Sequence, residues 1–217
     1  SNIISSLGMD TAAHWCAVTE GRTGITRYTD SSLSNTPFMA AKLDPAKLQA
    51  IREQTKPGIS LSPFEQLAAY SITKAIGTLD EPIDLAQAAF ILSTTKGNIE
   101  QLGNVPDERI SLHYSAKHVA NHIGMPGKVF VISHACVSGI VALQYGMRLI
   151  QAGRYKHVIV TGADRFSRFV LNGFQSFQAI SDEPCRPFDA ARKGITLGEA
   201  AATIILSANR TEHALGQ

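Results

Sequence analysis

Apolar residues follow two different spacings along this chain, and the two spacings alternate. Contiguous apolar runs, which are typical of strands buried on both faces, occupy 87–97, 127–135, 156–164 and 195–209. Helical spacing of apolar residues occurs at 11–21, 43–54, 62–79, 111–125 and 136–152. Buried strands that alternate with helices predict βαβ crossovers. The pattern therefore indicates an α/β fold with a parallel or mixed sheet covered by helices on both faces.

The clearest helix boundary is at the start of 62–79. Ser62 is an N-cap residue, Pro63 occupies the first helical position, and Glu65 completes a capping box. We expect Thr11 to cap the first helix in the same way. The chain opens with "SNIISSLG", and we expect no long strand before that helix.

Composition limits the classes of protein to consider. The 217 residues are 44% apolar and 18% charged, with a net charge of +2 and no basic cluster. Nothing here indicates a nucleic-acid partner. Apolar runs are far shorter than the ~20 residues that span a bilayer, and no leader pattern is seen, so we expect no membrane segment. The three cysteines lie far apart without a CxxC pair, which disfavours a disulfide framework or a zinc site. A cytoplasmic protein with reduced thiols is expected.

Cys136 stands where the strand 127–135 gives way to the helix 136–152. Ligands of α/β proteins bind at the carboxyl ends of strands, and a strand-to-helix turn can raise a nucleophile above the sheet. The start of the helix would favour the thiolate form of Cys136, and the Cys136 N–H could donate to an oxyanion. A buried cysteine between strand and helix is the alternative, and position alone does not separate the two.

The other candidate residues carry weaker signals. His134 is two residues from Cys136, but the turn breaks the strand alternation, so we expect a core histidine rather than a proton partner. His118 and His122 have the i, i+4 spacing of metal ligands, yet no third ligand is evident, and a packed or solvated face is expected. Cys16 in "HWCAV" fits a helical core pattern, and Cys185 lies on a loop.

The stretch 185–207 also contains unusual features. A charged cluster there is typical of a solvated loop or of a loop held in place by Arg–Asp pairs. Gly198 and Glu199 interrupt an apolar strand, which predicts a bulge. The charged residues are Arg186, Asp189, Arg192 and Lys193.

Several of these segments together resemble the β-ketoacyl-acyl-carrier-protein synthases. "HACVSGIVALQYGMRLIQAGRYKHVIVTGAD" (134–164) is similar to the nucleophile motif, long helix and strand ending in G-G-A-E/D of that family. "GFQSFQAIS" (173–181) and "CRPFDAARKGITLGEAAATIILS" (185–207) match its G-F-x-x-x-x-A-L-S and R-P-F-D…G-E-G-A segments. The opening 5–25 is similar to its S-P-x-G…W-x-A-L segment. The likeness runs from Ser5 to about Arg210.

The resemblance implies a thiolase-like fold of two similar halves, usually a homodimer, and residues 1–217 would be the N-terminal half. It makes Cys136 the acyl acceptor and its backbone N–H an oxyanion donor. It implies acyl carrier protein as the partner that brings acyl and malonyl thioesters, with no cofactor and no metal. The family's two histidines, a lysine and a second oxyanion donor lie in a later region, which would be the C-terminal half.

Three positions depart from the family pattern. His134 replaces a small hydroxyl residue, Thr161 replaces the first glycine of G-G-A, and Ala200 replaces the second glycine of G-E-G-A. None of them removes the nucleophile. The expected function is decarboxylative condensation through an acyl-Cys136 intermediate in fatty-acid or related polyketide or polyene synthesis. The alternatives are a non-catalytic partner subunit of the chain-length-factor type, which typically lacks the cysteine, and a thiolase.

Overall fold

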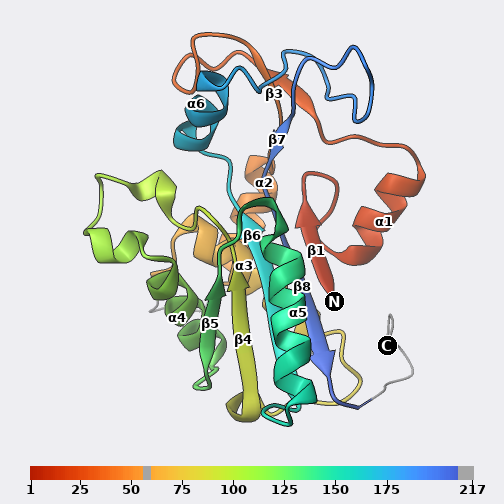
Figure 1. Ribbon diagram of the computed structural model, residues 1–217, viewed down its shortest axis with the longest axis vertical. Helices are drawn as coiled ribbons and strands as arrows, with labels where there is room; N and C mark the ends of the chain where they lie inside the picture. Colours follow the sequence, from red (N-terminus) through yellow and green to blue (C-terminus); the bar gives the residue numbers. More distant parts are fainter. Residues whose placement is uncertain (56–59, 210–217) are drawn as a thin grey trace.

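The fold is built on a five-stranded mixed sheet. The computed structural model describes residues 1–55 and 60–209. β4 pairs in parallel with β5 and β6, whereas β8 pairs antiparallel with β6 and β1. This arrangement confirms the predicted mixed sheet (Figure 1). The strand order is β1 (Asn2–Ser5), β8 (Ala200–Ser207), β6 (His157–Asp164), β4 (Ala88–Ser93) and β5 (Val129–Ile132).

Helices cover both faces of this sheet, as the sequence predicted. α3 (Pro63–Ile76) and α4 (Leu112–Ile123) pack on one face, and α5 (Ser138–Gln151) packs on the other. In Figure 1, α5 lies in front of the sheet and α3 behind it. Because side chains alternate along a strand, Ile159 of β6 contacts the α3 side, and its neighbours Val158 and Val160 contact the α5 side.

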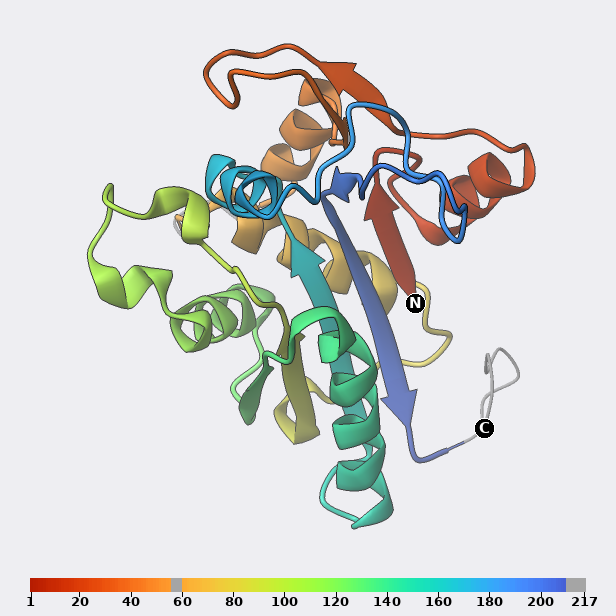
Figure 2. The same ribbon diagram turned by 45° about the horizontal axis from the view of Figure 1, so that its top comes forward.

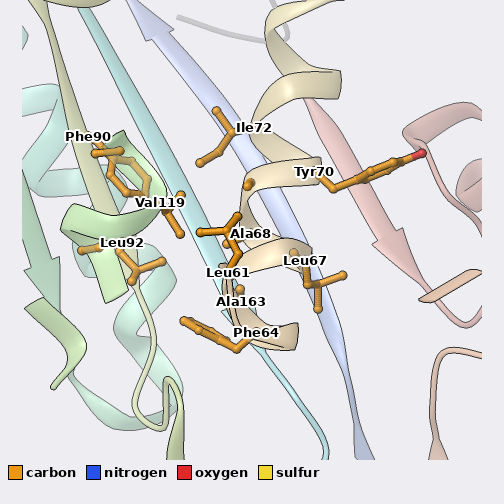
Figure 3. Packing of buried hydrophobic residues seen from close by; sticks show 14 of the residues in the cluster. Leu61, Phe64, Leu67, Ala68, Tyr70, Ile72, Phe90, Leu92, Val119 and Ala163 are labelled. Atoms are coloured by element: carbon orange, nitrogen blue, oxygen red, sulfur yellow. The ribbon is translucent and has the colours of Figure 1, made fainter. Parts of the chain in front are cut away.

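The larger hydrophobic core lies between the sheet and α3. Phe64, Leu67 and Ile72 of α3 are fully buried against large residues of β4, such as Phe90 (Figure 3). The expected capping box starts this helix: the Ser62 Oγ accepts from the Glu65 N–H at 3.1 Å, and the Glu65 Oε2 accepts from the Ser62 N–H at 2.9 Å. α3 is therefore fixed at its N-terminus and along its apolar face.

A second, smaller sheet lies beyond the carboxyl ends of β4 and β6. It contains β2 (Thr26–Tyr28), β3 (Phe38–Ala41) and β7 (Leu197–Gly198), and sequence patterning did not reveal it. Figure 2 shows β7 leading directly into β8 at this end of the molecule. Gly198 and Glu199 thus mark the change from one sheet to the other rather than a bulge within one strand. The remaining elements are α1 (Thr11–Thr19), α2 (Pro45–Glu53), α6 (Arg168–Ser176) and the 3-10 turns η1 (Leu85–Gln87), η2 (Ile99–Gln101), η3 (Asp107–Ile110) and η4 (Ala135–Val137).

The N-terminal region differs from expectation in two respects. The strand before the first helix, β1, has only four residues, as expected, and pairs with β8. Asp10, not Thr11, caps α1, because the Asp10 Oδ1 accepts from the Ala13 N–H at 2.8 Å. Cys16 is exposed rather than part of the core. Within the described ranges, no helix combines the length and the apolar character needed to cross a membrane.

Two further elements differ in detail. β5 was predicted as a buried strand, but all four of its residues are only half-buried, because β5 is the edge strand of the sheet. The helix predicted at 136–152 begins at Ser138, and Cys136 lies in the preceding η4 turn. Gly153 follows the helix with φ of 66°, a conformation that glycine adopts without strain.

Candidate active site

Cys136 sits on a tight turn between β5 and α5. Ala135 has φ of +47°, which is uncommon for a residue with a Cβ. Ser138 fixes the turn, because its hydroxyl accepts from the His134 N–H at 2.8 Å and donates to the Ala135 carbonyl at 2.7 Å. The Cys136 thiol is exposed, and within the described structure the Cys136 N–H has no hydrogen-bond partner. The turn therefore presents both groups outside the packed sheet.

A cavity of about 640 Å³ opens beside this turn. Its lining includes the start of α5 and the ends at which β6 stops and β8 begins. Under the body of α5, the face of the sheet that α5 covers carries large residues, including Ile91, Val160 and Leu206. Beneath the start of α5, the residues that β4, β6 and β8 place on this face before the end of β6 are small. Strand alternation places Ser93, Gly162, Ala200 and Ala202 there, and all four line the cavity with Cys136.

A carboxyl group lies at the edge of this floor. Asp164 is the last residue of β6, and alternation places it on the same face as Val160 and Gly162. The Thr94 Oγ1 donates to the Asp164 Oδ1 at 2.9 Å. Partial burial raises the pKa of the Asp164 carboxyl, and the Thr94 hydrogen bond and the charge of Lys96 act in the opposite direction. Asp164 and Thr94 both line the cavity.

A known protein family matches most of the chain. Residues 72–212, well over half of the chain, match the model of the beta-ketoacyl synthase N-terminal domain, and the match includes Cys136 and Asp164. The chain belongs to the beta-ketoacyl synthase family. It is thus a member of a family of ketosynthase-type condensing enzymes.

Curated relatives match less than half of this ketosynthase chain. Nodulation protein E of Rhizobium leguminosarum bv. trifolii is 34% identical over 101 residues, which are 46% of this chain and 25% of that protein. The tetracenomycin polyketide synthase ketoacyl synthase alpha subunit of Streptomyces glaucescens is 37% identical over 97 residues, 42% of this chain and 23% of that subunit. The matches thus span about a quarter of the length of these relatives.

Solved ketosynthases confirm the thiolase-like fold. The ketosynthase ApeO in complex with its chain length factor ApeC from Xenorhabdus doucetiae gives a TM-score of 0.75 at 22% identity, over 97% of this chain and 57% of that one. The ishigamide ketosynthase/chain length factor gives 0.77 at 23% identity, over 95% and 56%. At this identity the likeness concerns the fold alone.

Glu199 holds the two sheets of the ketosynthase fold together, a role that the sequence did not predict. Its carboxylate accepts from the Leu43 N–H at 2.7 Å and from the Phe166 N–H at 3.2 Å, and its residue is 3% exposed. The Arg165 Nε lies 3.4 Å from Glu199 and 3.6 Å from Glu100. Burial raises the pKa of the Glu100 carboxyl, Arg165 opposes this shift, and Glu199 adds to it.

Three histidines that the sequence singled out, His118, His122 and His134, do not line the cavity beside Cys136. His134 is exposed, not a core residue, because β5 ends at Ile132, and no hydrogen bond joins its ring to Cys136 in the described part of the chain. His118 hydrogen-bonds the buried Glu65 Oε2 through Nδ1 at 2.9 Å, and His122 is buried in α4. The prediction that His118 and His122 lie on a packed face of their helix is confirmed. Their i, i+4 spacing gave no indication that the Glu65 carboxylate of α3 lies against His118.

The remaining candidates do not reach the cavity. Cys16 is exposed on α1 and donates to the Glu20 Oε1 at 3.2 Å, and Cys185 is partly buried in its loop. The Arg186 Nη1 lies 3.2 Å from the Asp189 Oδ2, so this pair locks the loop as expected. Of the three cysteines, only Cys136 lines the cavity.

Proposed function

We propose that this chain provides the acyl-accepting site of a decarboxylating β-ketoacyl-carrier-protein synthase. The Cys136 thiolate attacks the carbonyl carbon of an acyl thioester. The new C–S bond forms first and places the negative charge on the carbonyl oxygen. When the carbonyl forms again, the bond to the donor sulfur breaks, and the donor leaves as a thiolate that takes a proton from water. The observation that supports this step most directly is the exposed thiol on a fixed turn at the mouth of a 640 Å³ cavity.

The backbone supports the same step. The Cys136 N–H has no intramolecular partner among the described residues, and an unpaired N–H beside a nucleophile is suited to stabilise the oxyanion that forms during attack. In the second step, malonyl-carrier protein loses carbon dioxide, and the resulting carbanion attacks the acyl-Cys136 carbonyl to give the 3-oxoacyl product and free thiolate. Acyl carrier protein is the proposed partner for both thioesters, in the cytoplasm.

The edge strand suggests how the protein assembles. Among the strands of residues 1–55 and 60–209, β5 pairs with β4 alone, and its four residues are apolar. An uncovered edge of this kind promotes aggregation, and antiparallel pairing with a second β5 would cover both edges in a two-fold contact. We propose a homodimer formed through β5. We expect residues 1–217 alone to associate or to be poorly soluble, and light scattering tests this expectation.

Selective alkylation tests the nucleophile. Limited iodoacetamide treatment followed by peptide mapping should label Cys136 faster than Cys16 and Cys185 near neutral pH. Cys16 is a matched control, because it is exposed as well. Faster or equal labelling of Cys16 in the folded protein would contradict the proposal, since exposure alone would then account for the reaction.

Acylation tests the function. An acyl N-acetylcysteamine thioester should add one acyl group to Cys136, Cys136→Ala should abolish the addition, and Cys16→Ala should not. We expect residues 1–217 alone to self-acylate slowly and to release no carbon dioxide from malonyl-carrier protein, because decarboxylation needs further electrophilic groups. Turnover near ~1 per second would contradict this expectation. An intact protein that alkylates at Cys136 but never acylates would favour the non-catalytic partner subunit.

A further inference from the structure

Ser138 is the buried residue at the end of the turn that presents Cys136. Residues 133–137 are all exposed, so side-chain packing does not hold the turn. Ser138, the first residue of α5, is only 6% exposed. Its hydroxyl accepts from the His134 N–H at 2.8 Å and donates to the Ala135 carbonyl at 2.7 Å, and the Ser138 N–H bonds to the same carbonyl. The shape of the turn therefore depends largely on hydrogen bonds made by Ser138.

The backbone of this turn needs such support. Ala135 has φ of +47°, a left-handed conformation that is unfavourable for a residue with a Cβ and persists only where its surroundings hold it. The Val137 N–H donates to the His134 carbonyl at 3.2 Å. Among the described residues, no side chain other than Ser138 hydrogen-bonds the backbone of 133–137. Loss of the Ser138 hydroxyl would leave this strained conformation without a side-chain partner.

The bond to the Ala135 carbonyl also sets the direction of the Cys136 N–H. The two groups belong to one planar peptide unit, in which the C=O and the N–H point in opposite directions. Ser138 holds the carbonyl from the start of α5, through both its hydroxyl and its N–H. The Cys136 N–H therefore points away from the start of α5, and it has no partner among the described residues.

We propose that Ser138 is a positioning residue, whose hydroxyl fixes the peptide unit between Ala135 and Cys136 so that the Cys136 N–H is oriented to donate to an oxyanion. This inference rests on the proposed function, because the oxyanion forms during acyl transfer to Cys136. A donor stabilises an oxyanion best when it is oriented before the reaction begins. Loss of the hydroxyl should thus slow acyl transfer more than a reaction of the same thiol that forms no oxyanion.

Two reactions of Cys136 separate these effects. Alkylation by iodoacetamide displaces iodide and forms no oxyanion, whereas acylation by an acyl N-acetylcysteamine thioester passes through one. In the intact protein, Ser138→Ala should acylate about tenfold more slowly, which is less than the loss of a whole oxyanion donor. Its alkylation rate should stay within about twofold of the wild type, with the same pH profile. Mass spectrometry of the Cys136 peptide measures both rates.

Two further variants show whether the hydroxyl itself is responsible. Ser138→Thr retains a hydroxyl and should acylate within about threefold of the wild type. Ser167→Ala is the matched control, because Ser167 is also 6% exposed and accepts from the Val170 N–H at 3.3 Å at the start of α6, away from the cavity beside Cys136. Ser167→Ala should lower the melting temperature and keep the wild-type ratio of acylation to alkylation.

The outcomes separate this inference from the proposed function. If the wild type is acylated and Ser138→Ala slows both reactions equally, or neither, the positioning role is wrong and the condensing function stands. If the wild type is alkylated at Cys136 but never acylated, both proposals fail. Thermal melts check the folding of each variant. If Ser138→Ala does not fold, Ser138→Cys, which introduces a weaker donor, is judged by the same ratio, with fragment-ion spectra to locate the modified residue.

Discussion

The two faces of the five-stranded sheet differ in how completely they are filled. On the α3 face, large side chains such as Phe90 and Leu92 are fully buried, and the buried Glu65 carboxylate is hydrogen-bonded. On the α5 face, the floor near Cys136 consists of small residues and leaves a cavity. The outer side of α5 exposes apolar residues, including Ile140 at 72% and Met147 at 46%. One face is therefore closely packed, and the other is left partly open.

The same chemical change on the two faces should have very different effects. Ile72→Ala removes a fully buried side chain from α3 and should lower the free energy of unfolding by about 3 kcal/mol. Ile140→Ala, on the exposed side of α5, should change it by less than about 0.5 kcal/mol. Urea denaturation measures both. A large loss from Ile140→Ala would show that this side chain is buried in the protein in solution, and the contrast between the faces would disappear.

Substitution of a buried polar group on the α3 face should lower the free energy of unfolding nearly as much as Ile72→Ala. The Glu65 carboxylate is fully buried and hydrogen-bonds the Ser62 N–H, the Asn98 side-chain amide at 2.9 Å and the His118 ring. Glu65→Gln places an NH₂ group against these partners and should lower the free energy of unfolding by about 2 kcal/mol. Glu81→Gln is the surface control. If the two substitutions have equal effects, the buried network does not contribute to stability.

The sequence predicted the stable face better than the reactive one, and the reason is physical. β4, β6 and the α3 capping box are local patterns, so contiguous apolar residues and the Ser62–Glu65 spacing were sufficient to find them. The Thr94–Asp164 pair joins residues 70 positions apart, and no local spacing reveals it. Cys16 was assigned to the core because of its helical core pattern, and His134 because the turn breaks the strand alternation. The exposure of these residues depends on how α1 packs and on where β5 ends.

The small sheet was missed for a related reason. β2, β3 and β7 have three, four and two residues, which is too short for a period of two to be recognised. The position of Cys136 at a strand-to-helix junction was predicted correctly. The turn itself was not, because the positive φ of Ala135 depends on hydrogen bonds made by Ser138. Motif resemblance singled out Cys136 as the proposed nucleophile, and the structure added the small residues and the carboxyl that line the cavity beside it.

Two glycines of α5 differ in how closely the helix approaches the sheet at their positions. A Cβ at Gly146 would lie 2.8 Å from the Leu206 Cδ1 and 3.2 Å from the Val158 Cγ1, so this turn of α5 touches the sheet closely. Gly146→Ala should lower the free energy of unfolding by about 1 kcal/mol, since overpacking outweighs the better helix propensity of alanine. Gly139 has no atom within 4 Å of such a Cβ, and Gly139→Ala should stabilise by about 0.5 kcal/mol. Stabilisation by both substitutions would show that α5 can move away from the sheet.

The smallest expected effect concerns the pH dependence of stability at the cavity. Burial raises the pKa of the Asp164 carboxyl, so between its ordinary value and its raised value the folded state binds more protons than the unfolded state. This contribution to the free energy of unfolding is fully present at low pH and decreases as pH rises through that window.

Asparagine does not titrate, so Asp164→Asn should gain stability relative to the wild type between about pH 4 and about pH 7. The gain should stay well below the ~1.4 kcal/mol of a full pKa unit, because the carboxyl is open to solvent. Urea denaturation at both pH values, with exposed Asp107→Asn as the control, measures it. A gain that is constant with pH or of opposite sign would mean that the cavity solvates Asp164 as well as water does, and that the open face of the sheet has no polar group of special character.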